Sequence, residues 1–359
     1  MILPRRIARA LPLLLVLLVP IALASGGEAG GAIDEHDAAA SGEAAVNVYS
    51  ARHYPTDETL YERFEELTGI EVNVIEGDSD ELISRIVSEG ANSPADVFVT
   101  VDAGRLWRAE QAELLAPVDS PVLEAKIPAN LRHPDGLWFG LTQRVRGIVY
   151  AKDRVDPGAI SSYEDLADPA WQDRVCIRSS GNVYNQSLLA SIIASDGAEA
   201  AERWAAGVVE NMARPPQGGD TDQIRAVAAG ECDVAVVNHY YLARMIASDD
   251  AGDREAASRV AWLFPNQDGR GAHVNISGAG VVATAPHRAN AILFLEYLAT
   301  PFAQELFSAG NDEFPVVPGV PVSEVAESFG DFVSDAVNVA VYGENNPQAV
   351  RIFDRVGWR

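Results

Sequence analysis

Four of the chain's ten tyrosines and one of its six histidines directly follow predicted strands. His53 and Tyr54 follow the strand "VNVYS", and Tyr184 follows "VCIRSS". Tyr240 and Tyr241 stand side by side in "NHYYLARM", after the apolar run "CDVAVV". Side chains of adjacent residues at a helix start point about 100° apart, so two neighbouring phenols cannot both face one apolar layer. Ligands of open α/β sheets bind beyond the carboxyl ends of the strands, so we expect these five side chains at one rim.

Phenols set a requirement on any metal that they bind. A protonated tyrosine oxygen is a weak ligand with an ordinary pKa of about 10, so only an acidic ion displaces its proton. Ferric iron meets this requirement, whereas zinc prefers imidazole and thiolate, and calcium and magnesium prefer carboxylate and carbonyl oxygen. Arg244 follows Tyr240 by four residues on the same helix face and could donate to a phenolate. Aromatic rings also stack on organic cations, so these residues alone leave a metal and an organic ligand equally open.

The composition is that of a globular protein with room for two domains. The chain has 359 residues, of which 48% are apolar and 22% charged. Its 27 basic and 52 acidic residues give a net charge of −25. This acidity argues against nucleic acid or an anionic membrane surface as a partner.

The N-terminus has the pattern of an export signal. Arg5, Arg6 and Arg9 precede the apolar run 10–24, which ends in the small-x-small sequence "ALA". We predict a signal peptide over 1–24, a flexible leader over 25–45 and a periplasmic mature protein. The pair Arg5-Arg6 leaves twin-arginine export and the general secretory route both open.

From residue 46 onward, apolar periodicity alternates between strand and helix, which is typical of an α/β fold with a mostly parallel sheet. The first helix is predicted over 56–69, with Thr56 as N-cap and Leu60, Phe64 and Leu67 on its buried face. Two α/β series are joined by extended stretches at 138–153 and 264–284. This order favours two lobes with crossing strands, which form a hinged clamp around a ligand.

The two cysteines, Cys176 and Cys232, each begin an apolar run. In an oxidising compartment two cysteines suggest one disulfide, which fits if these runs are neighbouring strands. Two buried free thiols remain the alternative.

Several long segments resemble the periplasmic iron(III)-binding proteins of ABC importers, in particular the tyrosine-rich type of cyanobacteria. They include "VNVYSARHYPTDETLYERFEELTGIEVNVIE", "RVCIRSSGNVYNQSLLAS" and "DTDQIRAVAAGECDVAVVNHYYLARM", and the similarity covers essentially the whole mature chain. The resemblance implies the type II periplasmic-binding-protein fold. We place one lobe at 46–143 plus 270–320 and the other at 144–269 plus 321–359. The ferric ligands that the resemblance implies are His53, Tyr54, Tyr184, Tyr240 and Tyr241, with Arg244 and Arg144 beside them.

The resemblance also implies the protein's role and partners. A monomer would capture one ferric ion in the cleft between the lobes and deliver it to an ABC permease driven by an ATPase subunit. Some relatives contribute a glutamate after the strand "ADVFVT", where this chain has Val101 and Asp102. Extra phenols would replace that carboxylate, which leaves the participation of an exogenous anion open. His239 is expected to neighbour the site without binding the metal.

An enzyme is not expected, because the sequence lacks the G-x-S-x-G, H-E-x-x-H and strand-linked G-x-G-x-x-G motifs. The alternative function within the same class is a binder of a small organic cation or metal chelate, held by the same aromatic side chains.

Overall fold

A nine-stranded mixed sheet forms the centre of the protein in a computed structural model that describes residues 44–52 and 54–359. The strand order is β2-β1-β3-β8-β4-β6-β5, with β7 and β9 each paired to β4. The strands are β1 (Ala45–Ser50), β2 (Glu71–Glu76), β3 (Val97–Val101), β4 (Phe139–Ala151), β5 (Val175–Cys176), β6 (Val234–Asn238), β7 (Val260–Leu263), β8 (Val274–Val281) and β9 (Phe314–Pro315). The predicted signal peptide and nearly all of the predicted leader lie outside the described residues.

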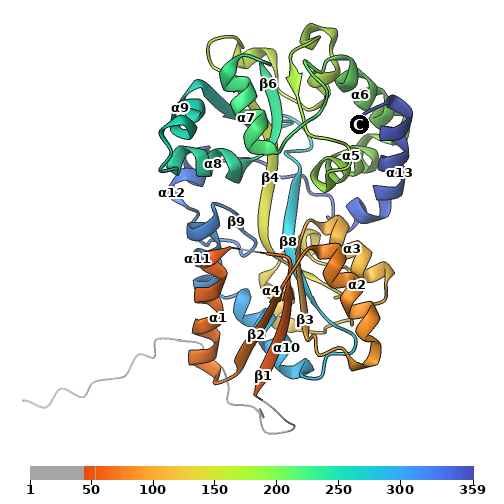
Figure 1. The fold of residues 1–359 in the computed structure, drawn as a ribbon, viewed down its shortest axis with the longest axis vertical. Helices are drawn as coiled ribbons and strands as arrows, with labels where there is room; N and C mark the ends of the chain where they lie inside the picture. Colours follow the sequence, from red (N-terminus) through yellow and green to blue (C-terminus); the bar gives the residue numbers. More distant parts are fainter. Residues whose placement is uncertain (1–43, 53) are drawn as a thin grey trace, which may run out of the picture. The chain divides into compact units, whose positions relative to one another are not determined.

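Helices flank the sheet (Figure 1). They are α1 (Pro55–Thr68), α2 (Ser79–Glu89), α3 (Ala103–Gln111), α4 (Pro121–Lys126), α5 (Val183–Asp196), α6 (Ala198–Glu210), α7 (Asp220–Ala229), α8 (His239–Ala247), α9 (Ala251–Arg259), α10 (Arg288–Leu298), α11 (Pro301–Asn311), α12 (Glu324–Glu327) and α13 (Val341–Val356). Short 3-10 helices occupy Gly90–Asn92, Ala129–Leu131, Pro157–Ala159, Glu164–Ala167 and Pro169–Trp171. Among the described residues, no helix is both long enough and apolar enough to span a membrane.

The strand β4 joins two halves of the sheet, as the two-lobed α/β prediction requires. Its first part pairs antiparallel with β8, down to Val145 opposite Val274. Its last part pairs with β6 from Arg146 onward and with β7 from Ile148 onward. We call β1, β2, β3 and β8 with the start of β4 the β1 half, and β5, β6 and β7 with the end of β4 the β6 half. Figure 1 shows β4 and β8 running between the helices of these halves. The predicted lobe boundaries stay a prediction.

The start of α1 differs from the prediction. Tyr54 is the N-cap residue and Pro55 occupies the first turn, where its fixed φ suits a helix and its missing N–H costs nothing. Thr56 therefore lies inside the helix. Leu60 and Phe64 are buried as predicted, but Leu67 is 51% exposed because the last turn of α1 buries no side chain.

The C-terminal helix α13, which the sequence did not predict, connects both halves by packing on α3, α5 and α6. Gly343 permits this contact, because a Cβ atom there would lie 2.1 Å from the Trp107 side chain of α3. Tyr342, Ile352 and Phe353 on the same helix are buried. The helix is thus fixed by tertiary packing.

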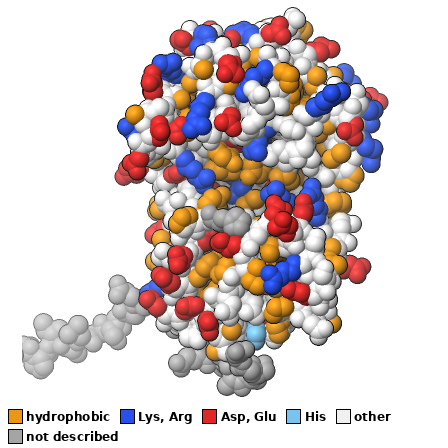
Figure 2. Space-filling view, in the orientation of Figure 1, with side chains coloured by type: hydrophobic (Ala, Val, Ile, Leu, Met, Phe, Trp, Pro, Cys, Tyr) orange, Lys and Arg blue, Asp and Glu red, His pale blue; other side chains and the backbone are white. Residues whose placement is uncertain are grey.

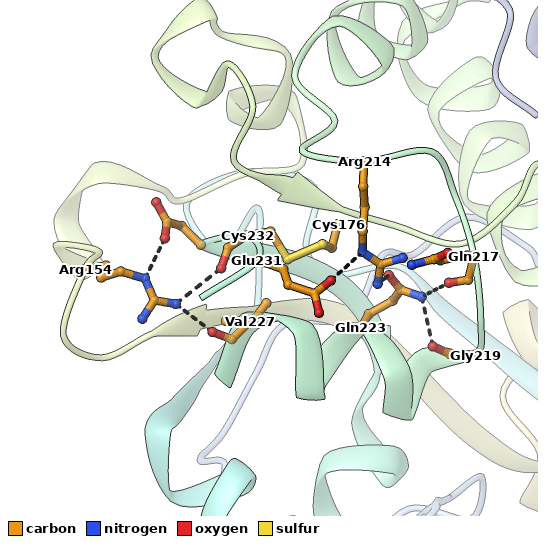
Figure 3. The surroundings of a disulfide bond; sticks show 10 residues. Arg154, Cys176, Arg214, Gln217, Gly219, Gln223, Val227, Glu231 and Cys232 are labelled. Atoms are coloured by element: carbon orange, nitrogen blue, oxygen red, sulfur yellow. Dashed lines mark hydrogen bonds and ion pairs between the residues drawn. A yellow bond between two sulfur atoms is a disulfide. The ribbon is translucent and has the colours of Figure 1, made fainter. Parts of the chain in front are cut away.

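The disulfide suggested by the two cysteines is present (Figure 3). Cys176 ends β5 and Cys232 lies two residues before the start of β6. These parallel strands are neighbours, and the two Cα atoms are 5.9 Å apart at the bridge. Beside it, Arg154 Nη2 donates to the backbone oxygens of Val227, at 2.6 Å, and Cys232, at 3.2 Å. The bridge therefore links the starts of two segments that lead to predicted site tyrosines.

Replacing both cysteines by alanine should lower the free energy of unfolding by about 2–5 kcal/mol, because the bridge closes a loop of 56 residues. Urea denaturation monitored by circular dichroism measures this loss. A reductant should destabilise the parent protein to the same extent and leave the double variant unchanged. Equal stability of parent and variant would contradict a structural role for the bridge.

Candidate metal centre

Three predicted ligands meet at the carboxyl edge of β5 and β6. Asn182 caps α5 by accepting a hydrogen bond from the backbone nitrogen of Tyr184 at 3.1 Å. Asn238 ends β6, and Tyr240 and Tyr241 follow in the first turn of α8. The hydroxyl oxygens of Tyr240 and Tyr184 are 3.4 Å apart, and the ring centroids of Tyr240 and Tyr241 are 4.5 Å apart. The parallel pairing of β5 and β6 thus brings together phenols 56 residues apart.

The fourth predicted phenol, Tyr54, comes from the β1 half and reaches this cluster through Arg244. The guanidinium carbon of Arg244 is 5.1 Å from the centroid of the Tyr54 ring and 4.8 Å from that of Tyr240. The guanidinium of Arg244 therefore lies over the faces of rings from both halves. This cation–π arrangement is favourable for an arginine. Figure 2 shows basic and apolar side chains, the latter including tyrosine, gathered at mid-height on this face. The fifth predicted ligand, His53, lies outside the described residues.

Five arginines approach the rings of Tyr54, Tyr184 and Tyr240, although the chain carries a net charge of −25. Their guanidinium carbons lie 4.6 to 5.9 Å from a ring centroid, and the residues are Arg52, Arg144, Arg146, Arg178 and Arg244. Three buried carboxylates, those of Asp57, Glu313 and Asp220, pair with all of them except Arg244. The surroundings of the phenols therefore carry an excess of positive charge, which favours phenolate.

Burial keeps two of these phenols protonated in the metal-free protein. Burial raises the pKa of Tyr241 to about 12, and the neighbouring Tyr184 and Asp220 act in the same direction. Burial also raises the pKa of Tyr240 well above its usual value, against the opposing effect of Arg144. Any ligand that needs phenolate must therefore displace protons here, whereas a stacking ligand need not.

The structure also shows the surroundings of Asp102 and His239, two residues that the sequence places near the candidate site. Asp102 is buried in a left-handed backbone conformation (φ 79°), where it caps α3 and accepts a hydrogen bond from Ser187 Oγ at 2.6 Å. Its carboxylate thus joins α3 to α5. The buried His239 ring contacts the backbone oxygen of Asp312 at 2.7 Å and stacks on Phe314. Burial lowers the pKa of His239 to about 4, so its imidazole is neutral at pH 7.

The sequence did not reveal the charged residues that surround the phenols, namely Arg52, Asp57, Arg146, Arg178, Asp220 and Glu313. One signal was available: Arg144 and Arg146 flank Val145 in a strand that is mostly apolar, and buried charges require partners. The partners themselves are 74 to 169 residues away. Within the described residues, no group of three or more His, Cys, Asp or Glu side chains could hold a metal ion.

Comparisons with known proteins place the chain in a family. Residues 92–331 match the model of the bacterial extracellular solute-binding proteins, and the chain belongs to this family. It is 51% identical to iron uptake protein A1 of Synechocystis over 88% of this chain and 87% of that protein. A solved Trichodesmium protein (IdiA, FutA) in complex with iron and citrate is 56% identical, with a TM-score of 0.86 over 88% of this chain and all of that one. The ferric binding protein of Campylobacter jejuni is 43% identical, with a TM-score of 0.82 over 88% and 100% of the two chains.

These relatives confirm the predicted fold and the predicted family. The solved relatives share the two-lobed type II fold, and the relatives named here are iron uptake or iron-binding proteins.

Alkaline conditions should destabilise the metal-free protein. Because the pKa of Tyr241 is raised above its unfolded value, this phenol contributes stability that is present below pH 10 and lost as the pH rises to about 12. Unfolding midpoints in urea measured from pH 8 to 11 should fall above pH 10. The variant Tyr241→Phe should show a smaller fall, and an identical fall would contradict the assignment.

Proposed function

We propose that the protein binds one ferric ion through Tyr54, Tyr184, Tyr240, Tyr241 and His53. The observation that carries this proposal is the convergence of phenols from both halves of the sheet around Arg244. Four phenolates on a trivalent ion would leave a net charge of about −1, which the excess of arginines balances. The iron names of the relatives support the same ligand.

Binding then follows from the chemistry of the phenols. The ferric ion displaces a proton from each coordinating phenol, since protonated phenol is a weak ligand. Tyr184, Tyr240 and Tyr241, held together in the β6 half, would bind the ion first. Closure of the β1 half would add Tyr54 and His53, a step that stabilises the closed state by the affinity of these extra ligands.

We further propose that the protein works in the periplasm as a monomer and delivers iron to an ABC permease with its ATPase subunit. Membership of the extracellular solute-binding family supports this role. Export would use the N-terminal signal over 1–24, by the Sec or the Tat route. We propose no enzymatic activity, in keeping with the binding and uptake functions named for the relatives.

Removing the two adjacent hydroxyls tests the metal proposal against an organic ligand. The double variant Tyr240→Phe/Tyr241→Phe keeps both rings, so stacking survives, whereas ferric affinity should fall by more than about 100-fold. Titration with ferric citrate should give a broad visible charge-transfer band that saturates at one iron per chain in the parent and is lost in the variant.

A matched control is Tyr297→Phe, which removes the hydroxyl of a buried tyrosine on α10 that has no hydrogen-bond partner in the described part of the chain. It should retain the band. If the parent shows no band although it is folded, the ferric proposal is wrong and organic cations become the ligands to screen.

Proton release gives a second test. Ferric binding measured by calorimetry in two buffers of different ionisation enthalpy should release one proton for each coordinating phenol, and affinity should fall as the pH falls. Tyr241→Phe should release one proton fewer than the parent. Release that is equal in both proteins would show that the phenol of Tyr241 does not bind the metal.

A further inference from the structure

Glu313 lies between α11 and β9 with no exposed surface, and each of its carboxylate oxygens binds a different arginine. Oε2 accepts from Arg52 Nη1 at 2.9 Å and from Thr142 Oγ1 at 3.0 Å. Oε1 accepts from Arg144 Nη2. One carboxylate thus joins the β1–α1 turn to the long crossing strand β4. Although burial opposes ionisation, Arg144 and Arg52 lower the pKa of Glu313 to about 2, so it is a carboxylate at pH 7.

The two arginines differ in how much they depend on Glu313. Arg52 also binds Asp57, through Nε at 3.0 Å and Nη2 at 3.3 Å. Among the described residues, Arg144 has Glu313 as its only carboxylate partner and otherwise donates to the hydroxyl of Ser277. Removing the charge of Glu313 would therefore release Arg144 more than Arg52.

Each of the two arginines lies over the ring of a different proposed ligand. The guanidinium carbon of Arg52 is 4.6 Å from the ring centroid of Tyr54, and that of Arg144 is 5.4 Å from the ring centroid of Tyr240. Arg144 is only 1% exposed, yet its Nε and Nη1 have no hydrogen-bond partner among the described residues. Buried donors without partners are rare in folded proteins, so these two donors of Arg144 call for a functional explanation.

Stability alone does not account for this arrangement. Burying an ion pair costs as much desolvation as it returns in attraction, and apolar replacements are often neutral or stabilising. The guanidiniums of Arg52 and Arg144 are both bound to one carboxylate, and they lie next to phenols that must lose protons to bind a metal. They therefore provide fixed positive charge where negative charge develops.

We propose that Glu313 is a positioning residue for ferric binding, which holds Arg144 beside Tyr240 and Arg52 beside Tyr54 so that their charges stabilise the phenolates. This inference rests on the proposed function. Two donors of Arg144 have no partner among the described residues, and its guanidinium lies over the Tyr240 ring, so we assign these donors to the phenolate that forms when Tyr240 ionises.

The absorption band reports this role directly. Donation of a hydrogen bond to a phenolate lowers the energy of its electrons and moves the phenolate-to-iron band to shorter wavelength. Displacing Arg144 should therefore shift the band to longer wavelength. A purely structural role for Glu313 would lower stability and leave the wavelength unchanged.

The experiment compares the full chain with Glu313→Gln, Arg144→Gln and the double variant. Glutamine matches the size of glutamate, but its amide group opposes one of the two guanidiniums and cannot hold both. We expect Glu313→Gln to shift the band to longer wavelength and to weaken ferric binding by about 10- to 100-fold. The double variant should be shifted no further than Arg144→Gln, since both changes remove one interaction.

The control is Asp96→Asn, which removes another fully buried carboxylate, one that binds the backbone nitrogen of Asn47 and the ring of His287. It should lower stability without shifting the band. If Glu313→Gln does not fold, Arg144→Lys, which keeps the charge and loses the forked donors, must show the shift. A parent-like band and affinity in a folded Glu313→Gln, or a parent-like band in Arg144→Lys, overturns the proposal. Absence of a band in the parent overturns the proposed function instead.

Discussion

Negative charge is costly on a buried phenol, and the charged side chains around the candidate site are arranged to offset that cost. Burial and the neighbouring Tyr184 raise the pKa of both Tyr240 and Tyr241, so the metal-free state favours the protonated form of these two phenols. Five arginines around the cluster oppose that preference. Tyr240 and Tyr241 therefore keep their protons without a metal, and the nearby positive charge favours their ionisation when a strongly acidic cation binds.

This balance explains why so acidic a chain concentrates basic side chains at one place. Three carboxylates, Asp57, Glu313 and Asp220, neutralise part of the arginine charge and fix the guanidiniums that they bind. Arg244 has no such partner among the described carboxylates and lies between rings of the two halves. The charge of Arg244 can therefore stabilise a phenolate at either Tyr54 or Tyr240. When the two halves close, the same arginine stabilises ligands from both of them.

The sequence predicted the parts of the site that follow from local rules. Parallel strands end at the same edge of a sheet, so tyrosines that follow β5 and β6 had to meet, and the structure brings Tyr184 to Tyr240. It could not supply Glu313, whose role depends on Arg52 and Arg144, 261 and 169 residues away. Helix α13 was missed for a related reason. Gly343 and Pro347 argue against a helix locally, and only packing on α3, α5 and α6 fixes it.

The supporting structure is as specific as the ligands themselves. The disulfide joins Cys176, at the end of β5, to Cys232, two residues before β6, and the segments that follow these cysteines carry Tyr184, Tyr240 and Tyr241. On the other side, Glu313 and Ser277 tie Arg52 of the β1 half to Arg144 on the crossing strand. A covalent bridge thus joins the two segments that carry three phenols, and a buried ion network holds arginines beside Tyr54 and Tyr240. Because the phenols come from both halves while β4 is continuous through both, a change in the angle between the halves must alter the ligand geometry and the position of Arg144 together.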